Sequence, residues 1–90
     1  MRGNKPVEEV RFGGLLMDIE RQVLSIAERE LGLPAGVIPI TDRLDIYFED
    51  SLEWFEYIVC LRSEVGNITD EQAAAAETFE QLRDALAIPN

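Results

Sequence analysis

Two stretches of this sequence place apolar residues with the period of an α-helix, and this periodicity constrains the fold more than any other feature. In residues 15–31 the apolar positions recur three or four residues apart with charged side chains between them, and residues 51–65 repeat the pattern. Gly32 and Pro34 end the first stretch, and Gly66 ends the second. We therefore predict two amphipathic helices that pack through their apolar faces.

Two further helix starts follow in the last third of the chain. Thr69 with Gln72, and Thr78 with Gln81, have the spacing of a capping box, in which a threonine and a glutamine three residues later bond to each other's backbone. The first of these starts precedes a short alanine-rich segment. The sequence thus predicts an all-α fold, a four-helix bundle whose third helix is short.

The segments outside these helices differ in character. Residues 1–13 mix charges with glycine and proline and lead into Gly13-Gly14, so we predict a flexible N-terminal tail before a domain at 14–88. Residues 32–49 form a long loop between the first two helices that is rich in apolar side chains. A loop this long is uncommon, and we expect it to pack across the bundle.

Polar residues that can cap a helix stand at the start of the helix predicted from Ser51. Asp50 can cap it, and Glu53 can return a hydrogen bond to the backbone in capping-box fashion. Ser51 then lies in the first turn, where unpaired backbone N–H groups and the positive end of the helix dipole favour a phosphate. As a first-turn residue, Ser51 is also explained as a simple helix starter.

This helix carries two apolar stripes. The first is predicted to be the core face and comprises Trp54, Tyr57, Ile58, Leu61 and Val65. The second comprises Leu52, Phe55 and Val59, on the side of Ser51 and next to Glu53 and Glu56. Two interpretations of the second stripe stay open: the 32–49 loop covers it, or it forms a docking patch or the lining of a ligand cavity.

The charge of the chain is strongly acidic and uneven. It carries 8 basic and 18 acidic side chains, with a net charge of −1 in residues 1–41 and −9 in residues 42–90. Nucleic acid is excluded as a partner on this ground, because phosphate-binding surfaces need positive charge. Basic protein surfaces are the expected partners, although the acidic residues are also explained by solubility alone.

Several kinds of chemistry are excluded by composition. The chain has no histidine, which removes Ser-His and Cys-His nucleophilic pairs and His-containing zinc sites. The carboxylates do not have calcium-loop spacing, so we expect no metal site and no enzyme activity. Cys60 is the only cysteine, which suits a reducing cytoplasm, and we expect neither a membrane span nor an export signal.

Taken together, these residues resemble the acyl carrier proteins, in which the serine of an Asp-Ser-Leu motif at the start of the second helix is modified. The resemblance covers roughly residues 15–88. It rests on the motif Asp50-Ser51-Leu52 and on the flanking pieces Ile40-Thr41-Asp42-Arg43-Leu44-Asp45, Ser51-Leu52-Glu53, Phe55-Glu56, Leu61, Glu64-Val65-Gly66, Ile68-Thr69-Asp70-Glu71 and Thr78-Phe79-Glu80-Gln81-Leu82.

The resemblance implies a non-catalytic, monomeric phosphoprotein. A phosphopantetheinyl transferase would attach 4′-phosphopantetheine from coenzyme A to Ser51, with Asp50 and Leu52 completing the motif. The arm would carry acyl or aminoacyl thioesters to the ligases, synthases and transferases of fatty acid, polyketide or related biosynthesis. Their basic surfaces would meet Glu53 and Glu56, while Leu52, Phe55 and Val59 supply the apolar centre.

The chain departs from the family pattern near the motif. Phe48 stands where the family has glycine, and Glu49 stands where it has an apolar residue; Trp54 and Phe55 are bulkier than usual. Phe48 and Glu49 support an alternative function: an unmodified acidic helical interaction module that has the carrier fold and lacks the arm. The bulky side chains would reduce any acyl cavity, which fits a specialised carrier as well as a housekeeping one. The sequence names neither the cargo nor the pathway.

Overall fold

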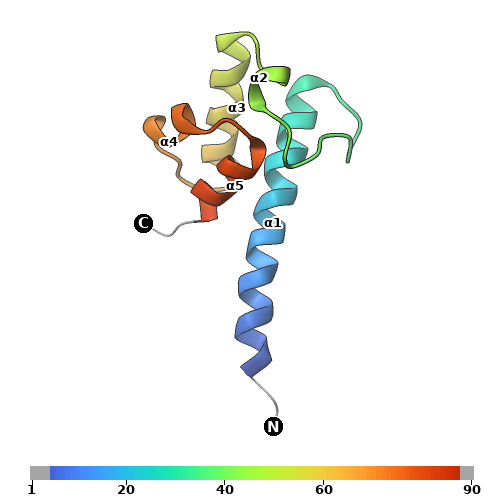
Figure 1. The fold of residues 1–90 in the computed structure, drawn as a ribbon, viewed down its shortest axis with the longest axis vertical. Helices are drawn as coiled ribbons and strands as arrows, with labels where there is room; N and C mark the ends of the chain where they lie inside the picture. Colours follow the sequence, from blue (N-terminus) through green and yellow to red (C-terminus); the bar gives the residue numbers. More distant parts are fainter. Residues whose placement is uncertain (1–4, 88–90) are drawn as a thin grey trace.

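The computed structural model describes the backbone of residues 5–87 and the side chains of residues 16–87, and the named secondary-structure elements of this part of the chain are all α-helices (Figure 1). The predicted all-α class is therefore confirmed. The helices are α1 (Lys5–Leu31), α2 (Leu44–Tyr47), α3 (Ser51–Glu64), α4 (Asp70–Ala75) and α5 (Phe79–Ala87). Helix α1 packs against α5 and α3, and α4 packs against α5.

Helix α1 begins earlier than predicted. Its first residue is Lys5 rather than a position near Leu15, so it runs through Gly13-Gly14, and its first turns extend beyond the other helices (Figure 1). Extending a helix that is already nucleated forms one hydrogen bond for each residue fixed, and this gain offsets the roughly 1 kcal/mol that each glycine costs relative to alanine. Of the predicted tail, residues 1–4 lie outside the described residues, as does residue 88 of the predicted domain.

The end of α1 is where the sequence predicts it. Gly32 has a φ of 71°, in the left-handed region that glycine adopts without the penalty of a Cβ atom. Its N–H donates to the carbonyl oxygen of Arg29 at 3.3 Å, and the N–H of Leu33 donates to that of Glu28 at 2.8 Å. These bonds satisfy backbone carbonyls that the end of a helix leaves unpaired.

The long connection after α1 crosses the bundle as expected, but it contains a short helix that the sequence did not indicate. Helix α2 spans four residues and buries Leu44, and the connection also buries Ile38 and Phe48. With a single buried position and no side-chain cap, α2 is too short to give a periodic pattern.

A buried carboxylate fixes the middle of this connection to α1. Glu28 is only 4% exposed, and its Oε2 accepts hydrogen bonds from the N–H groups of Val37 and Ile38 at 3.0 and 3.2 Å. Two backbone donors thus offset part of the cost of burying the charge. Glu28 thereby acts as an anchor for a segment without regular structure.

The last part of the connection pairs with the start of α5. Leu44 N–H donates to the carbonyl oxygen of Glu77 at 2.9 Å, Phe79 N–H to that of Asp42 at 3.2 Å and Glu80 N–H to that of Ile40 at 2.9 Å. Residues 40–44 are therefore tied to residues 77–80, which are distant in sequence.

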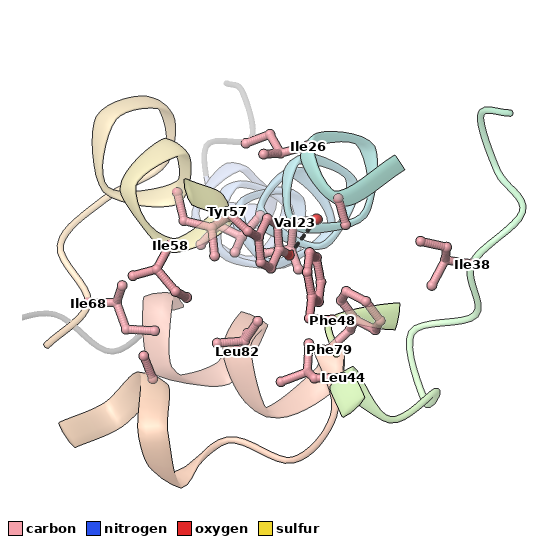
Figure 2. Close-up of a cluster of buried hydrophobic side chains, with 14 residues drawn as sticks. Val23, Ile26, Ile38, Leu44, Phe48, Tyr57, Ile58, Ile68, Phe79 and Leu82 are labelled. Carbon is pink, nitrogen blue, oxygen red and sulfur yellow. Dashed lines mark hydrogen bonds between the residues drawn. The ribbon is translucent and has the colours of Figure 1, made fainter. Parts of the chain in front are cut away.

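The core lies where α1, α3 and α5 meet. Its largest fully buried side chains are Tyr57, Phe79, Leu61, Leu82 and Val23. Figure 2 shows Tyr57 of α3 directed towards Val23 of α1, with Phe48, Phe79 and Leu82 nearby. Full burial of a large apolar side chain contributes roughly 1.5–3 kcal/mol, so this cluster is a major source of stability.

The predicted core stripe of α3 is confirmed at its centre and differs at its ends. Tyr57, Ile58 and Leu61 are buried, whereas Trp54 and Val65 are half-buried. Both ends of the stripe lie near helix termini, where fewer elements are available to cover a side chain.

Both capping boxes form. At α4, Gln72 N–H donates to Thr69 Oγ1 and Thr69 N–H donates to Gln72 Oε1, each at 3.0 Å. At α5, Gln81 N–H and Thr78 N–H make the equivalent bonds, each at 3.2 Å. The two short C-terminal helices therefore begin where the sequence predicts.

Candidate functional site

Ser51 is the first residue of α3 and is exposed to solvent. Asp50 caps the helix, its carboxylate accepting a hydrogen bond from Leu52 N–H at 2.9 Å. The reciprocal bond expected from Glu53 does not form between described residues. The Ser51 hydroxyl is therefore held at a helix N-terminus and accessible from outside.

The first turn of α3 keeps backbone donors available. Trp54 N–H donates to the carbonyl oxygen of Asp50 at 3.0 Å, and Leu52 N–H donates to the side-chain carboxylate of Asp50. The N–H groups of Ser51 and Glu53 have no protein acceptor within residues 5–87. Such donors, with the positive end of the helix dipole, favour an anionic group bound to Ser51.

The second apolar stripe is exposed. Leu52, Phe55 and Val59 are 61%, 59% and 44% exposed, so the interpretation in which the 32–49 loop covers them is wrong. The loop instead directs Ile38, Leu44 and Phe48 to the core. Three large apolar side chains on one helix face, left open to solvent, are typical of an interaction surface.

Acidic side chains flank this stripe. Glu49, Asp50, Glu53 and Glu56 are all exposed, and none of them takes part in an ion pair within the described part of the chain. The ion pairs among the described residues lie elsewhere: Arg29 pairs with Glu30 and Glu64, Arg43 with Asp45 and Glu77, Arg62 with Asp70, and Arg83 with Glu20, Glu80 and Asp84. The surface around Ser51 is therefore negative and apolar at once.

A surface pocket of about 260 Å³ lies between α2, α3 and α4. It is lined by Arg43, Leu44, Asp45, Phe48, Trp54, Ala73, Ala74, Ala76 and Glu77. Two of these residues, Phe48 and Trp54, are each three positions from Ser51. The sequence did not indicate this pocket, because its lining comes from separate elements and shares no spacing; the alanine run of α4 was its only local sign.

The departure at Phe48 is accommodated inside the fold. Phe48 is 8% exposed and stacks on Tyr57, with ring centroids 4.7 Å apart and planes 14° from parallel. Its ring therefore packs in the core and is almost completely buried. Glu49 is exposed and adds to the negative charge beside the motif.

Other candidate groups lie apart from Ser51 or do not form. Cys60 is half-buried, and its Sγ lies 3.5 Å from Glu30 Oε2; burial, followed by the hydrogen bond with Glu30, raises the pKa of the thiol. No cluster of three or more potential metal ligands occurs among the described residues. Within the same residues, no helix has the length and apolarity needed to cross a membrane.

Comparison of the chain with protein-family models gives no match, and comparison with curated proteins finds no relative.

Proposed function

We propose that this protein is an acyl carrier, a four-helix bundle of acyl-carrier-protein type in which α1, α3, α4 and α5 are the four helices. The observation that supports this proposal is the exposed hydroxyl of Ser51 at the first position of α3, flanked by Asp50 and Leu52. An attached group needs such a position, since a buried hydroxyl could be neither modified nor presented.

The residues around Ser51 fit a 4′-phosphopantetheine group. The free N–H groups of the first turn stabilise its phosphodiester, and the carboxylates of Asp50, Glu49 and Glu53 direct the negative group outwards to solvent. When bound, the group supplies a terminal thiol that holds an acyl or aminoacyl chain as a thioester. Tethering then raises the effective concentration of this cargo at each enzyme to which the protein docks.

Docking is the contribution of the exposed face of α3. Glu53 and Glu56 attract arginine and lysine side chains of a phosphopantetheinyl transferase or a synthase, while Leu52, Phe55 and Val59 provide the apolar centre. Binding of this kind is fast and weak, which allows one carrier to serve successive enzymes. We place this activity in the cytoplasm and assign it to a monomer.

An unmodified interaction module is the alternative function. Phe48 supports this alternative less than the sequence suggested, because its ring lies in the core. The remaining support is Glu49, which is exposed beside Ser51. The exposed stripe of α3 would serve either function, so the presence of the arm is the decisive difference.

Intact mass after co-expression with a promiscuous phosphopantetheinyl transferase separates the two functions. We expect the wild-type chain to gain the mass of the arm and Ser51→Ala to gain nothing. Ser63→Ala, which changes a serine near the other end of α3, is the matched control and should be modified like the wild type. If the wild-type chain gains no mass with several transferases, the carrier function is wrong.

A further inference from the structure

The pocket between α2, α3 and α4 lies within reach of any group attached to Ser51. Trp54 lines it and follows Ser51 by three positions on α3, a spacing that places Cβ atoms about 5–6 Å apart on a helix surface. Phe48 lines it from the other side of the motif. Attachment of a group to Ser51 does not require this pocket, so the pocket has no role in the proposed function as stated above.

The pocket borders the core through Leu44, Phe48 and Ala73, and two aromatic rings, Phe48 and Trp54, meet in its lining. Phe48 and Trp54 meet edge to face with centroids 5.6 Å apart, and Phe48 stacks on the fully buried Tyr57. Phe79, also fully buried, lies beside both of these rings, with its centroid 6.4 Å from that of Phe48 and 6.4 Å from that of Tyr57. Figure 2 shows Phe48, Tyr57 and Phe79 grouped between the short helix α2 and the centre of the bundle. A chain entering from the pocket would have to displace this packed group, at the cost of its buried contacts.

The size and rim of the pocket also limit what it can hold. Its volume of about 260 Å³ is below the range of roughly 300–1,000 Å³ that is usual for small-molecule sites. Its rim carries Arg43, whose guanidinium lies 3.0 Å from Asp45 and 4.0 Å from Glu77. A long apolar chain would therefore leave the pocket across a charged edge, while a short chain would stay on the rings and on Ala73, Ala74 and Ala76.

We propose that Phe48 and Trp54 are specificity-determining residues that restrict the cargo to short acyl groups, which rest in this pocket while attached to the arm on Ser51. This inference rests on the proposed carrier function. It adds a substrate class to that function, because the same site with smaller side chains at these two positions would be open towards the core.

The test compares acyl forms of the full chain. The apo protein is loaded with acetyl, butyryl or decanoyl groups by a phosphopantetheinyl transferase, which moves the acyl-phosphopantetheine arm from the corresponding acyl coenzyme A onto the Ser51 hydroxyl and releases adenosine 3′,5′-bisphosphate. Loading is verified by intact mass. We expect butyryl to raise the melting temperature above that of the acetyl form, because each methylene that enters the pocket is removed from water, and decanoyl to raise it no further. Trp54 is the only tryptophan, so its emission should shift with butyryl and change no more with decanoyl.

Variants assign the restriction to the aromatic wall. In Trp54→Ala, decanoyl should raise the melting temperature more than butyryl does. Trp54→Leu, which keeps more of the packing, should give the same order with a smaller difference if the alanine variant does not fold. Met17→Ala, which truncates an exposed side chain on α1, should behave like the wild type.

The outcomes separate this proposal from the one on which it rests. If no arm is attached, the carrier function fails and the cargo restriction fails with it. If loading is normal but decanoyl stabilises the wild type more than butyryl, or if melting temperature and Trp54 emission do not depend on the acyl group, only the restriction by Phe48 and Trp54 is wrong.

Discussion

The hydroxyl of Tyr57 donates a hydrogen bond to the backbone carbonyl oxygen of Val23 across 2.8 Å, and both residues are completely buried (Figure 2). Burial holds the pKa of Tyr57 well above its ordinary value, so the hydroxyl keeps its proton and remains a donor. This bond joins α3, the helix that carries Ser51, to α1. It fixes the position of α3 from within the core.

Tyr57→Phe should therefore lower the free energy of unfolding by about 0.5–1.5 kcal/mol, because it removes the bond and keeps the ring. The loss is at this modest level since the Val23 carbonyl lies inside α1 and retains its helical hydrogen bond. Urea unfolding followed by circular dichroism measures it. Tyr47→Phe removes a bond to Asp42 in a half-buried setting, where water can replace it, and should cost less. An equal or larger cost at Tyr47 would contradict this assignment.

Asp50→Ala should destabilise the protein by about 0.5–2 kcal/mol, because the cap on Leu52 N–H is lost. Asp50→Asn keeps an oxygen acceptor in the same place and should restore most of the stability. Thermal unfolding of the two variants beside the wild type gives the comparison. Similar losses in both variants would show that the charge of Asp50, rather than its hydrogen bond, stabilises the start of α3.

The stability of the folded protein at acid pH should depend on Glu64. Hydrogen bonds from Arg29, at 3.2 and 2.5 Å, hold the pKa of Glu64 below its ordinary value. A carboxylate with a lowered pKa stabilises the folded state above its unfolded pKa, about 4.3, and this contribution is lost as the pH falls through the folded pKa. Both side chains are largely exposed, so the effect should be small.

Melting temperatures measured from pH 7 down to about pH 3 test this dependence. The wild type should lose more stability below about pH 4.3 than Glu64→Gln, which has no titratable group at this position. Glu71→Gln, at an exposed position on α4, is the control and should follow the wild-type curve. Parallel curves for Glu64→Gln and the wild type would mean that the ion pair adds nothing in solution.

Reversal of two charges on α3 should slow modification of Ser51. Glu53→Lys combined with Glu56→Lys places positive charge at the proposed docking face, and the transferase rate should fall roughly tenfold or more at low salt. Asp18→Lys with Glu71→Lys changes the total charge equally on other helices and should reduce the rate much less. Unchanged circular dichroism would establish that the helices remain. Equal rates in the two double variants would exclude Glu53 and Glu56 from the docking surface.

Salt should reduce the difference between these two variants. Exposed charges are screened beyond about 10 Å at 0.1 M ionic strength, so the contribution of Glu53 and Glu56 should weaken steadily as salt is added. If the rate difference between the two double variants persists unchanged at high salt, the substitutions at Glu53 and Glu56 act by altering the shape of the docking surface rather than its charge.

The sequence predicted the elements whose signals are local. The Asp50 cap, the Thr69–Gln72 and Thr78–Gln81 boxes and the Gly32 end of α1 each depend on a few adjacent residues, and each lies where expected. The predicted start of α1 was wrong because the residues before Leu15 extend a helix that is already formed downstream, and this extension offsets the cost of Gly13 and Gly14.

Features formed by distant segments could not be predicted in the same way. Periodicity shows that Leu52, Phe55 and Val59 share a face, but only packing decides whether the 32–49 loop covers that face. Likewise, the pocket beside Trp54 is lined by residues of α2, α3 and α4. These residues come together only in the folded chain, so their spacing in the sequence gives no sign of the pocket.

The backbone pairing of residues 40–44 with residues 77–80 links the connection before α3 to the start of α5. The stretch that leads into Ser51 is thereby held in place by the entrance to the last helix. Loosening of α5 would therefore reach Ser51 without any substitution in its own neighbourhood. Truncation or tagging close to α5 should therefore be weighed against its effect on Ser51, some thirty positions earlier in the chain.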